Sequence, residues 1–151
     1  MTPSAKLVAS VKAAFADLGT PPIGGISEVP ENDEGTTEYF TGKLWQGHTP
    51  EALNRHSFAL LVFTPEAFRY YLPAFLIASL EAPDEAPLDS VISAISPPKD
   101  NPKRPSFWRR WSLFSPAQRR VIVECLKYWS AEGYLGISWA AARSLEATID
   151  A

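Results

Sequence analysis

Apolar residues recur at the spacing of α-helices along most of this chain. In residues 3–18, one face carries an apolar side chain every three or four positions, and lysines and an aspartate lie off that face. A run of apolar residues at 57–63 is too short to separate a strand from further helix. The same periodicity predicts helices over residues 50–56, 88–95, 116–131 and 138–149.

The most apolar segment, residues 65–81, is predicted to be the central helix. Its apolar side chains fall on nearly all sides, which is typical of a helix packed by several neighbours. Pro73 lies inside this segment. Because proline has no N–H and clashes with the carbonyl four residues earlier, that of Arg69, we expect a kink there.

Four hydroxyl–proline pairs indicate where helices begin. The hydroxyl can accept a hydrogen bond from an N–H of the first turn, and the proline occupies a position whose N–H would have had no partner. The pairs are Thr2-Pro3, Thr49-Pro50, Thr64-Pro65 and Ser115-Pro116.

Residues 20–48 lack helical periodicity and are rich in glycine and proline, so they are expected to be irregular, with a short hairpin near residues 37–45 as an alternative. Residues 99–105 are polar and are predicted to form a surface loop. The chain is therefore expected to be mainly α, a compact bundle of about five helices around a kinked central helix. We expect residues 1–151 to form a single helical domain.

Composition narrows the class of protein. Apolar residues make up 46% of the chain, which excludes a disordered protein, and the net charge is −3. The single cysteine, Cys125, cannot form an intramolecular disulfide, so a reducing compartment is expected. No secretory signal is evident, and the longest apolar run, residues 70–80, is about half of what a bilayer requires. A cytoplasmic protein that does not enter the membrane is expected.

Three stretches resemble a family of small bacterial proteins of unknown function. They are GKLW at 42–45, FTPEAFRYYLPAFL at 63–76 and SPAQR at 115–119. Their order and spacing match the family from about residue 11 to residue 129. The resemblance implies a bacterial, cytoplasmic, single-domain protein, and it implies no activity. The basic, proline-containing residues 99–110 depart from the family pattern, so a function located there would belong to this protein alone.

Motifs for metal, nucleotide or nucleophilic chemistry are missing from the sequence. His48 and His56 are far from Cys125, and no Cys/His ligand cluster occurs, so no metal and no cofactor are expected. There is no glycine-rich phosphate loop and no serine nucleophile elbow, so no catalytic residue is assigned. Cys125 falls on the apolar stripe of its predicted helix, which favours an inert core thiol.

Arg69, Tyr70 and Tyr71 place a charge and two hydroxyls in the most apolar helix. The favoured interpretation is that Arg69 pairs with a carboxylate at the edge of the core while both tyrosines pack. The alternative is a polar pocket at the expected kink.

Charge is segregated along the chain. Residues 99–120 carry seven lysines and arginines against one aspartate, a net +6, interleaved with aromatic residues. Basic and aromatic side chains together can bind single-stranded nucleic acid, for which Arg104, Trp108, Arg109 and Arg110 are the candidate contacts. The favoured interpretation is that these aromatics turn inward, because the whole chain is acidic. Residues 28–38 carry five carboxylates and no base: Glu28, Glu31, Asp33, Glu34 and Glu38.

The leading hypothesis is a small protein-interaction module without catalysis, whose five carboxylates bind another protein. One version is an immunity-type protein, in which the acidic segment occupies the basic cleft of a toxin. The alternatives are nucleic-acid binding through residues 99–120, which the acidic net charge disfavours, and an enzyme with an unrecognised site near Arg69.

Overall fold

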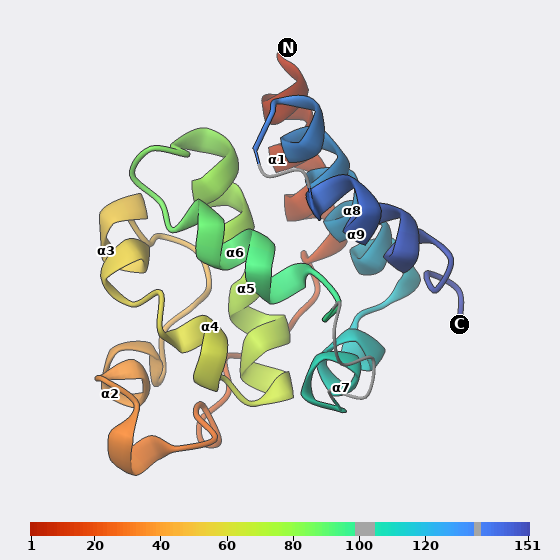
Figure 1. Cartoon of the computed structure of the whole chain (residues 1–151). Helices are drawn as coiled ribbons and strands as arrows, with labels where there is room; N and C mark the ends of the chain where they lie inside the picture. The colour runs from red at the N-terminus through yellow and green to blue at the C-terminus, as the bar shows by residue number, and fades with distance from the viewer. Residues whose placement is uncertain (99–104, 135–136) are drawn as a thin grey trace.

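The computed structural model describes residues 1–98, 105–134 and 137–151, and these residues form a mainly α-helical protein. Nine α-helices and one 3₁₀ turn occur within those ranges. In chain order they are α1 (Pro3–Ala14), the 3₁₀ turn η1 (Pro30–Asn32), α2 (Thr36–Phe40), α3 (Pro50–Arg55), α4 (Ala59–Val62), α5 (Pro65–Glu81), α6 (Leu88–Ile95), α7 (Pro105–Leu113), α8 (Pro116–Ala131) and α9 (Ile137–Glu146) (Figure 1).

The four hydroxyl–proline pairs begin helices α1, α3, α5 and α8, as predicted. Thr2, Thr49, Thr64 and Ser115 have extended backbones, and each hydroxyl accepts a hydrogen bond of 3.1–3.2 Å from the N–H three residues later. At α8 the Ser115 N–H also donates to the Gln118 side chain, which completes a capping box. These helix starts are therefore determined by local sequence.

Helix α5 occupies the centre of the molecule. Twelve of its 17 residues are buried, so neighbours surround it, as the all-round apolar pattern predicted. The helix continues through Pro73, which leaves the Arg69 carbonyl without its usual N–H donor. The kink expected there stays a prediction.

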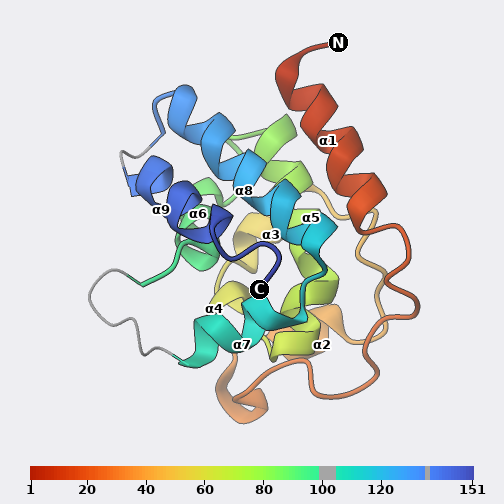
Figure 2. The same cartoon turned by 90° about the vertical axis from the view of Figure 1, so that its right-hand side faces the viewer.

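The other helices pack around α5 in two groups. Helix α1 lies against both α5 and α8, and α8 packs in turn against α9 (Figure 2). Helices α3, α6 and α7 contact other parts of α5, and α4 contacts α6. One hydrophobic cluster joins these elements and includes Phe15, Phe75, Trp129 and Leu145.

The short elements correct several expectations. No hairpin forms near residues 37–45 within the described ranges, because α2 occupies much of that segment. Residues 57–63 contain α4, followed by Phe63, which pairs with Ser27 in an isolated antiparallel bridge. Helix α7 begins at Pro105, where a loop was expected, and residues 99–104 lie outside the described residues. The described residues hold nine α-helices where about five were expected: α2 and α7 were not predicted, and residues 57–63, which hold α4, had been left open between strand and helix.

Candidate functional site

The acidic segment surrounds η1 and α2 at one end of the molecule, beside α4 (Figure 1). The side chains of Glu28, Glu31, Glu34 and Glu38 are exposed. None of the four forms an ion pair with another described residue. Glu34 has a left-handed backbone with φ of 51°, a conformation that is uncommon for residues other than glycine, asparagine and aspartate.

Asp33, the fifth predicted contact, has a different role. Its side chain is only 5% exposed and accepts hydrogen bonds from the Thr37 N–H at 3.0 Å and the Thr37 hydroxyl at 2.5 Å. Burial alone would raise the pKa of Asp33, but hydrogen bonds from Thr37, Ser27 and Gly35 lower it below its ordinary value. Asp33 therefore holds the start of α2, and it is not available to a partner.

Two exposed apolar side chains lie beside these carboxylates. The Glu28 N–H donates to the Val62 carbonyl at 2.7 Å, and this contact places Val29 alongside the end of α4. Leu61 of α4 is 73% exposed, and Val29 is 36% exposed. We call Glu28, Val29, Glu31, Glu34, Glu38 and Leu61 the acidic surface.

Arg110 reaches from α7 to support α4. Its guanidinium donates to the carbonyls of Leu60 at 2.8 Å, Phe63 at 3.0 Å and, more weakly, Leu61 at 3.4 Å. It also lies 4.3 Å from the centre of the Phe68 ring. Burial lowers the pKa of Arg110 to about 10, against the opposing effect of the Glu28 carboxylate. These donors are used inside the protein, so Arg110 is not placed to contact a phosphate, and that candidate role is corrected.

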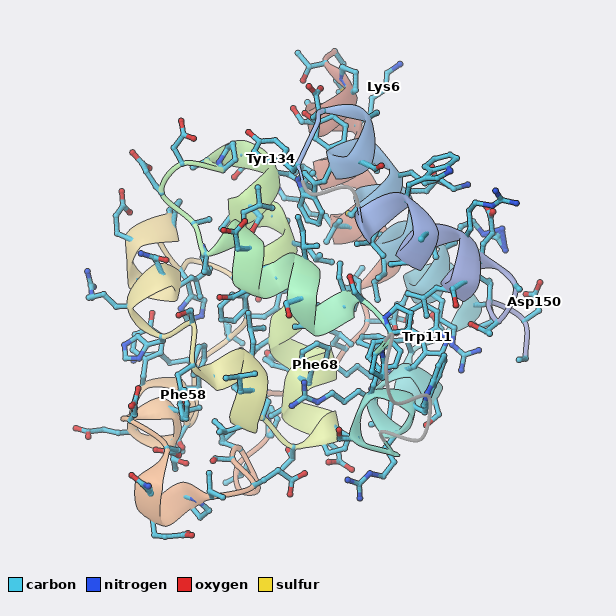
Figure 3. All side chains as sticks on the ribbon, in the orientation of Figure 1. Lys6, Phe58, Phe68, Trp111, Tyr134 and Asp150 are labelled. Carbon is cyan, nitrogen blue, oxygen red and sulfur yellow. The ribbon has the colours of Figure 1, made fainter. Side chains whose placement is uncertain are left out.

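The described tryptophans of the basic tract also pack inward. Trp111 is 5% exposed, and its indole N–H donates to the Thr148 hydroxyl at 2.9 Å; Figure 3 shows Trp111 near the junction of α7 with the end of the chain. Trp108 is half-buried against the core, whereas Arg109 is exposed. Arg104 lies outside the described residues. The stacking platform that single-stranded nucleic acid requires is thus not displayed by Trp108 and Trp111.

Arg119 is a second arginine that binds backbone instead of carboxylates. It is 7% exposed, and its Nε and terminal nitrogens donate to the carbonyls of Trp111, Ser112, Thr148 and Ile149 and to the backbone oxygen of Ala151. The end of the chain is therefore held against α7 and α8 by one side chain.

The polar pocket considered as an alternative near Pro73 stays a prediction, whereas the packing of both tyrosines is confirmed. Tyr70 and Tyr71 are buried, as favoured, and the Tyr71 hydroxyl lies 2.6 Å from the Phe40 carbonyl and 2.8 Å from the Lys43 carbonyl. Burial, followed by the neighbouring Tyr70, raises the pKa of Tyr71. The prediction that Arg69 pairs with a carboxylate is wrong as far as the described residues go, because none of their carboxylates forms an ion pair with it. The buried Nε of Arg69 has no hydrogen bond to these residues either.

A groove of about 520 Å³ lies elsewhere, between α1, α5 and the segment leading into α3. This size suits a small organic molecule or a short peptide. Sequence reasoning missed it, because its walls come from three distant parts of the chain and no motif joins them. The principal wall residues are Lys12, Trp45, His48, Ile77, Ala78 and Glu81.

His48 is fixed in position on the wall of the groove. Its Nε2 lies 2.7 Å from the Leu44 carbonyl, which can only accept, so Nε2 carries a proton. In the neutral ring, Nδ1 then accepts from the Tyr39 hydroxyl, which lies 2.8 Å away. Both ring nitrogens are occupied, so His48 in this arrangement shapes the groove and has no free lone pair with which to act as a base.

His56 belongs to the same aromatic group. Its ring stacks on Tyr39 with 4.1 Å between centroids, and the Lys43 ammonium lies 4.1 Å from the centre of the Tyr39 ring. Burial lowers the pKa of His56, and the positive charges of Arg55 and Lys43 lower it further. The two histidines are thus joined through Tyr39, a link that their spacing did not indicate.

The described residues offer little support for a metal site, a reactive thiol or a membrane span. Within residues 1–98, 105–134 and 137–151, no three histidine, cysteine or acidic side chains gather as a metal site would require. Cys125 is fully buried, and burial raises the pKa of its thiol. In the same part of the chain, every helix is too short or too polar to cross a bilayer.

Comparison with known proteins gives one match. A model described as "Family of unknown function (DUF6714)" matches residues 4–141. Neither a curated protein nor a solved structure matches the chain. The match agrees with the resemblance to a family without an assigned activity. The chain belongs to DUF6714, a family of unknown function.

Proposed function

We propose that this protein is a cytoplasmic interaction module whose acidic surface binds a basic surface on another protein. One observation carries the proposal: four exposed glutamates, none of which forms an ion pair with a described residue, lie in the same surface region as the exposed Leu61 and Val29. Protein interfaces commonly combine a few apolar contacts with a polar, charged rim.

The hydrogen bonds of Arg110 and Arg119 support this proposal. Arg110 and Arg119 direct their donors to backbone oxygens, and neither forms an ion pair with the side-chain carboxylate of a described residue, although Glu28 still acts on the pKa of Arg110. The four glutamates present their carboxylates to solvent without an ion-pair partner among the described residues. Such a surface attracts a positively charged partner over distance and raises the rate of association.

Leu61 supplies the apolar contact. Helix α4 has only four residues, but Arg110 and the Glu28 N–H bind its carbonyls and those next to it, so Leu61 projects from a supported backbone. A side chain carried by a supported backbone loses less conformational entropy on binding than one carried by a mobile loop. Within this proposal, the immunity-type version identifies the basic partner as a toxin, by analogy of size and charge alone.

The test begins with affinity capture from lysate of the source cells, followed by measurements on the purified partner. The variant carries E28Q, E31Q, E34Q and E38Q and retains Asp33, because Asp33 caps α2. The matched control carries D17N, D84N, E85Q and E132Q, which remove the same charge from exposed positions elsewhere. We expect the first variant to bind the purified partner more slowly and less tightly, with a weaker salt dependence, and the control to bind normally.

A second comparison tests the apolar contact. Leu61→Ser is expected to weaken binding, whereas Trp139→Ser, which alters an exposed residue on α9, leaves it unchanged. Full affinity after neutralisation of all four glutamates would contradict the proposal. The immunity version requires in addition that the partner be toxic when expressed alone and harmless when co-expressed with this protein.

A further inference from the structure

The groove described above combines an apolar floor with charges of opposite sign. Ile77, Ala78 and the Trp45 indole supply apolar surface. Lys12 reaches the groove from α1, and Glu81, the last residue of α5, lines it as well. Such a lining favours a ligand that has an apolar body and also carries charge.

Lys12 and Glu81 have no ion-pair partner in the part of the chain that the structure describes. Both side chains are exposed, and neither forms an ion pair with a described residue, including with each other. Glu81 also lies at the C-terminal end of α5, where the helix dipole adds partial negative charge. A cation at this end of the groove and an anion near Lys12 would therefore both be favoured.

His48 also lines the groove, and two hydrogen bonds within the protein fix its orientation before any ligand enters. The hydrogen bonds to the Leu44 carbonyl and the Tyr39 hydroxyl hold the ring, so a ligand meets a wall that needs no rearrangement. The groove thus resembles a binding site more than a catalytic one.

We infer that this groove binds a small zwitterion with an apolar body, namely an amino acid or short peptide whose carboxylate pairs with Lys12 and whose ammonium pairs with Glu81. The volume of about 520 Å³ accommodates a peptide of a few residues. This site lies apart from the acidic surface, and the inference does not depend on the proposed protein partner.

The test uses the dipeptide Trp-Leu and three blocked forms, with binding to the full chain followed by NMR chemical-shift titration. Acetylation removes the ammonium, amidation removes the carboxylate, and the doubly blocked form lacks both. We expect Trp-Leu to bind tightest. Lys12→Gln should weaken Trp-Leu about three- to fivefold, the contribution of an exposed ion pair, and leave the amidated peptide unchanged. Glu81→Gln should show the converse, weakening Trp-Leu and leaving the acetylated peptide unchanged.

Lys6→Gln and Glu85→Gln are the matched controls, because both residues are exposed and neither lines the groove. All four substitutions alter surface positions, and circular dichroism verifies that each variant is folded. The inference is overturned if millimolar Trp-Leu shifts no resonance, if the doubly blocked peptide binds equally well, or if the controls weaken binding as much as Lys12→Gln and Glu81→Gln. Loss of protein-partner binding would not affect this result, since it reports on the acidic surface.

Discussion

Replacement of Arg110 by methionine removes the support of α4 while preserving much of the side-chain volume. The variant loses two well-formed hydrogen bonds, to the Leu60 and Phe63 carbonyls, and one long contact to the Leu61 carbonyl. A hydrogen bond from a charged donor contributes about 1.5–3 kcal/mol, and an acceptor left without a partner costs about 1–3 kcal/mol. Against this, methionine avoids the cost of burying a guanidinium, a cost shown by the lowered pKa of Arg110.

The two effects oppose each other, and we expect the free energy of unfolding to fall by about 2–3 kcal/mol. Urea unfolding followed by circular dichroism measures this change. Arg109→Met is the control, because Arg109 is the adjacent, exposed arginine, and it should change stability by less than about 0.5 kcal/mol. Equal stability of Arg110→Met and the unaltered protein, or an equal loss in the control, would refute the reasoning. If the acidic surface binds a partner, Arg110→Met should also weaken that binding through Leu61.

Three further predictions concern the segment around α2 and its aromatic neighbours. Asp33→Ala should lower the free energy of unfolding by about 1–2 kcal/mol in urea titrations because it removes the cap of α2, and Glu34→Gln should stay within about 0.5 kcal/mol. Glu34→Gly should raise stability by about 0.5–1 kcal/mol, since relief of the left-handed strain exceeds the added entropy of the unfolded chain; a loss of stability would contradict this. The lowered pKa of His56 means that the unfolded chain, with an ordinary value of 6.5, takes up the proton first as the pH falls. Stability due to His56 is therefore complete above pH 6.5 and lost as the pH falls through the lower folded pKa, so unfolding measured on either side of 6.5 should show a smaller pH dependence in His56→Phe.

The sequence predicted those elements whose signals are local. The starts of α5 at Pro65 and of α8 at Pro116 agree with the structure because each depends on a hydroxyl and an N–H three residues apart. Helix α2 was missed because it has five residues, too few for a periodic pattern, and its cap Asp33 was interpreted as one of several surface carboxylates. A capping aspartate and a solvent-exposed glutamate look alike in a charged run.

Contacts between residues far apart in the chain could not be predicted from local sequence patterns. Arg110 donates to carbonyls 47–50 positions earlier in the chain, and backbone acceptors leave no mark on the sequence. For the same reason, a charged residue in a basic tract could be assigned to a nucleic-acid surface when its partner was the protein's own backbone. The groove required Lys12, His48 and Glu81 to meet, which follows only from the packing of α1 against α5.

Helix α2 joins two regions that are separate in their chemistry. Glu38 points to solvent within the acidic surface, while the adjacent Tyr39 holds His48 on the wall of the groove. In a helix of five residues, a displacement that moves one of these neighbours moves the other as well. If a partner at the acidic surface shifts α2 and so changes the affinity of the groove for its ligand, thermodynamic reciprocity requires the ligand to change the affinity for the partner by the same factor. The occupancy of the groove would then set the fraction of the protein that is bound to its partner, and a small zwitterion would regulate a protein complex through a helix of five residues.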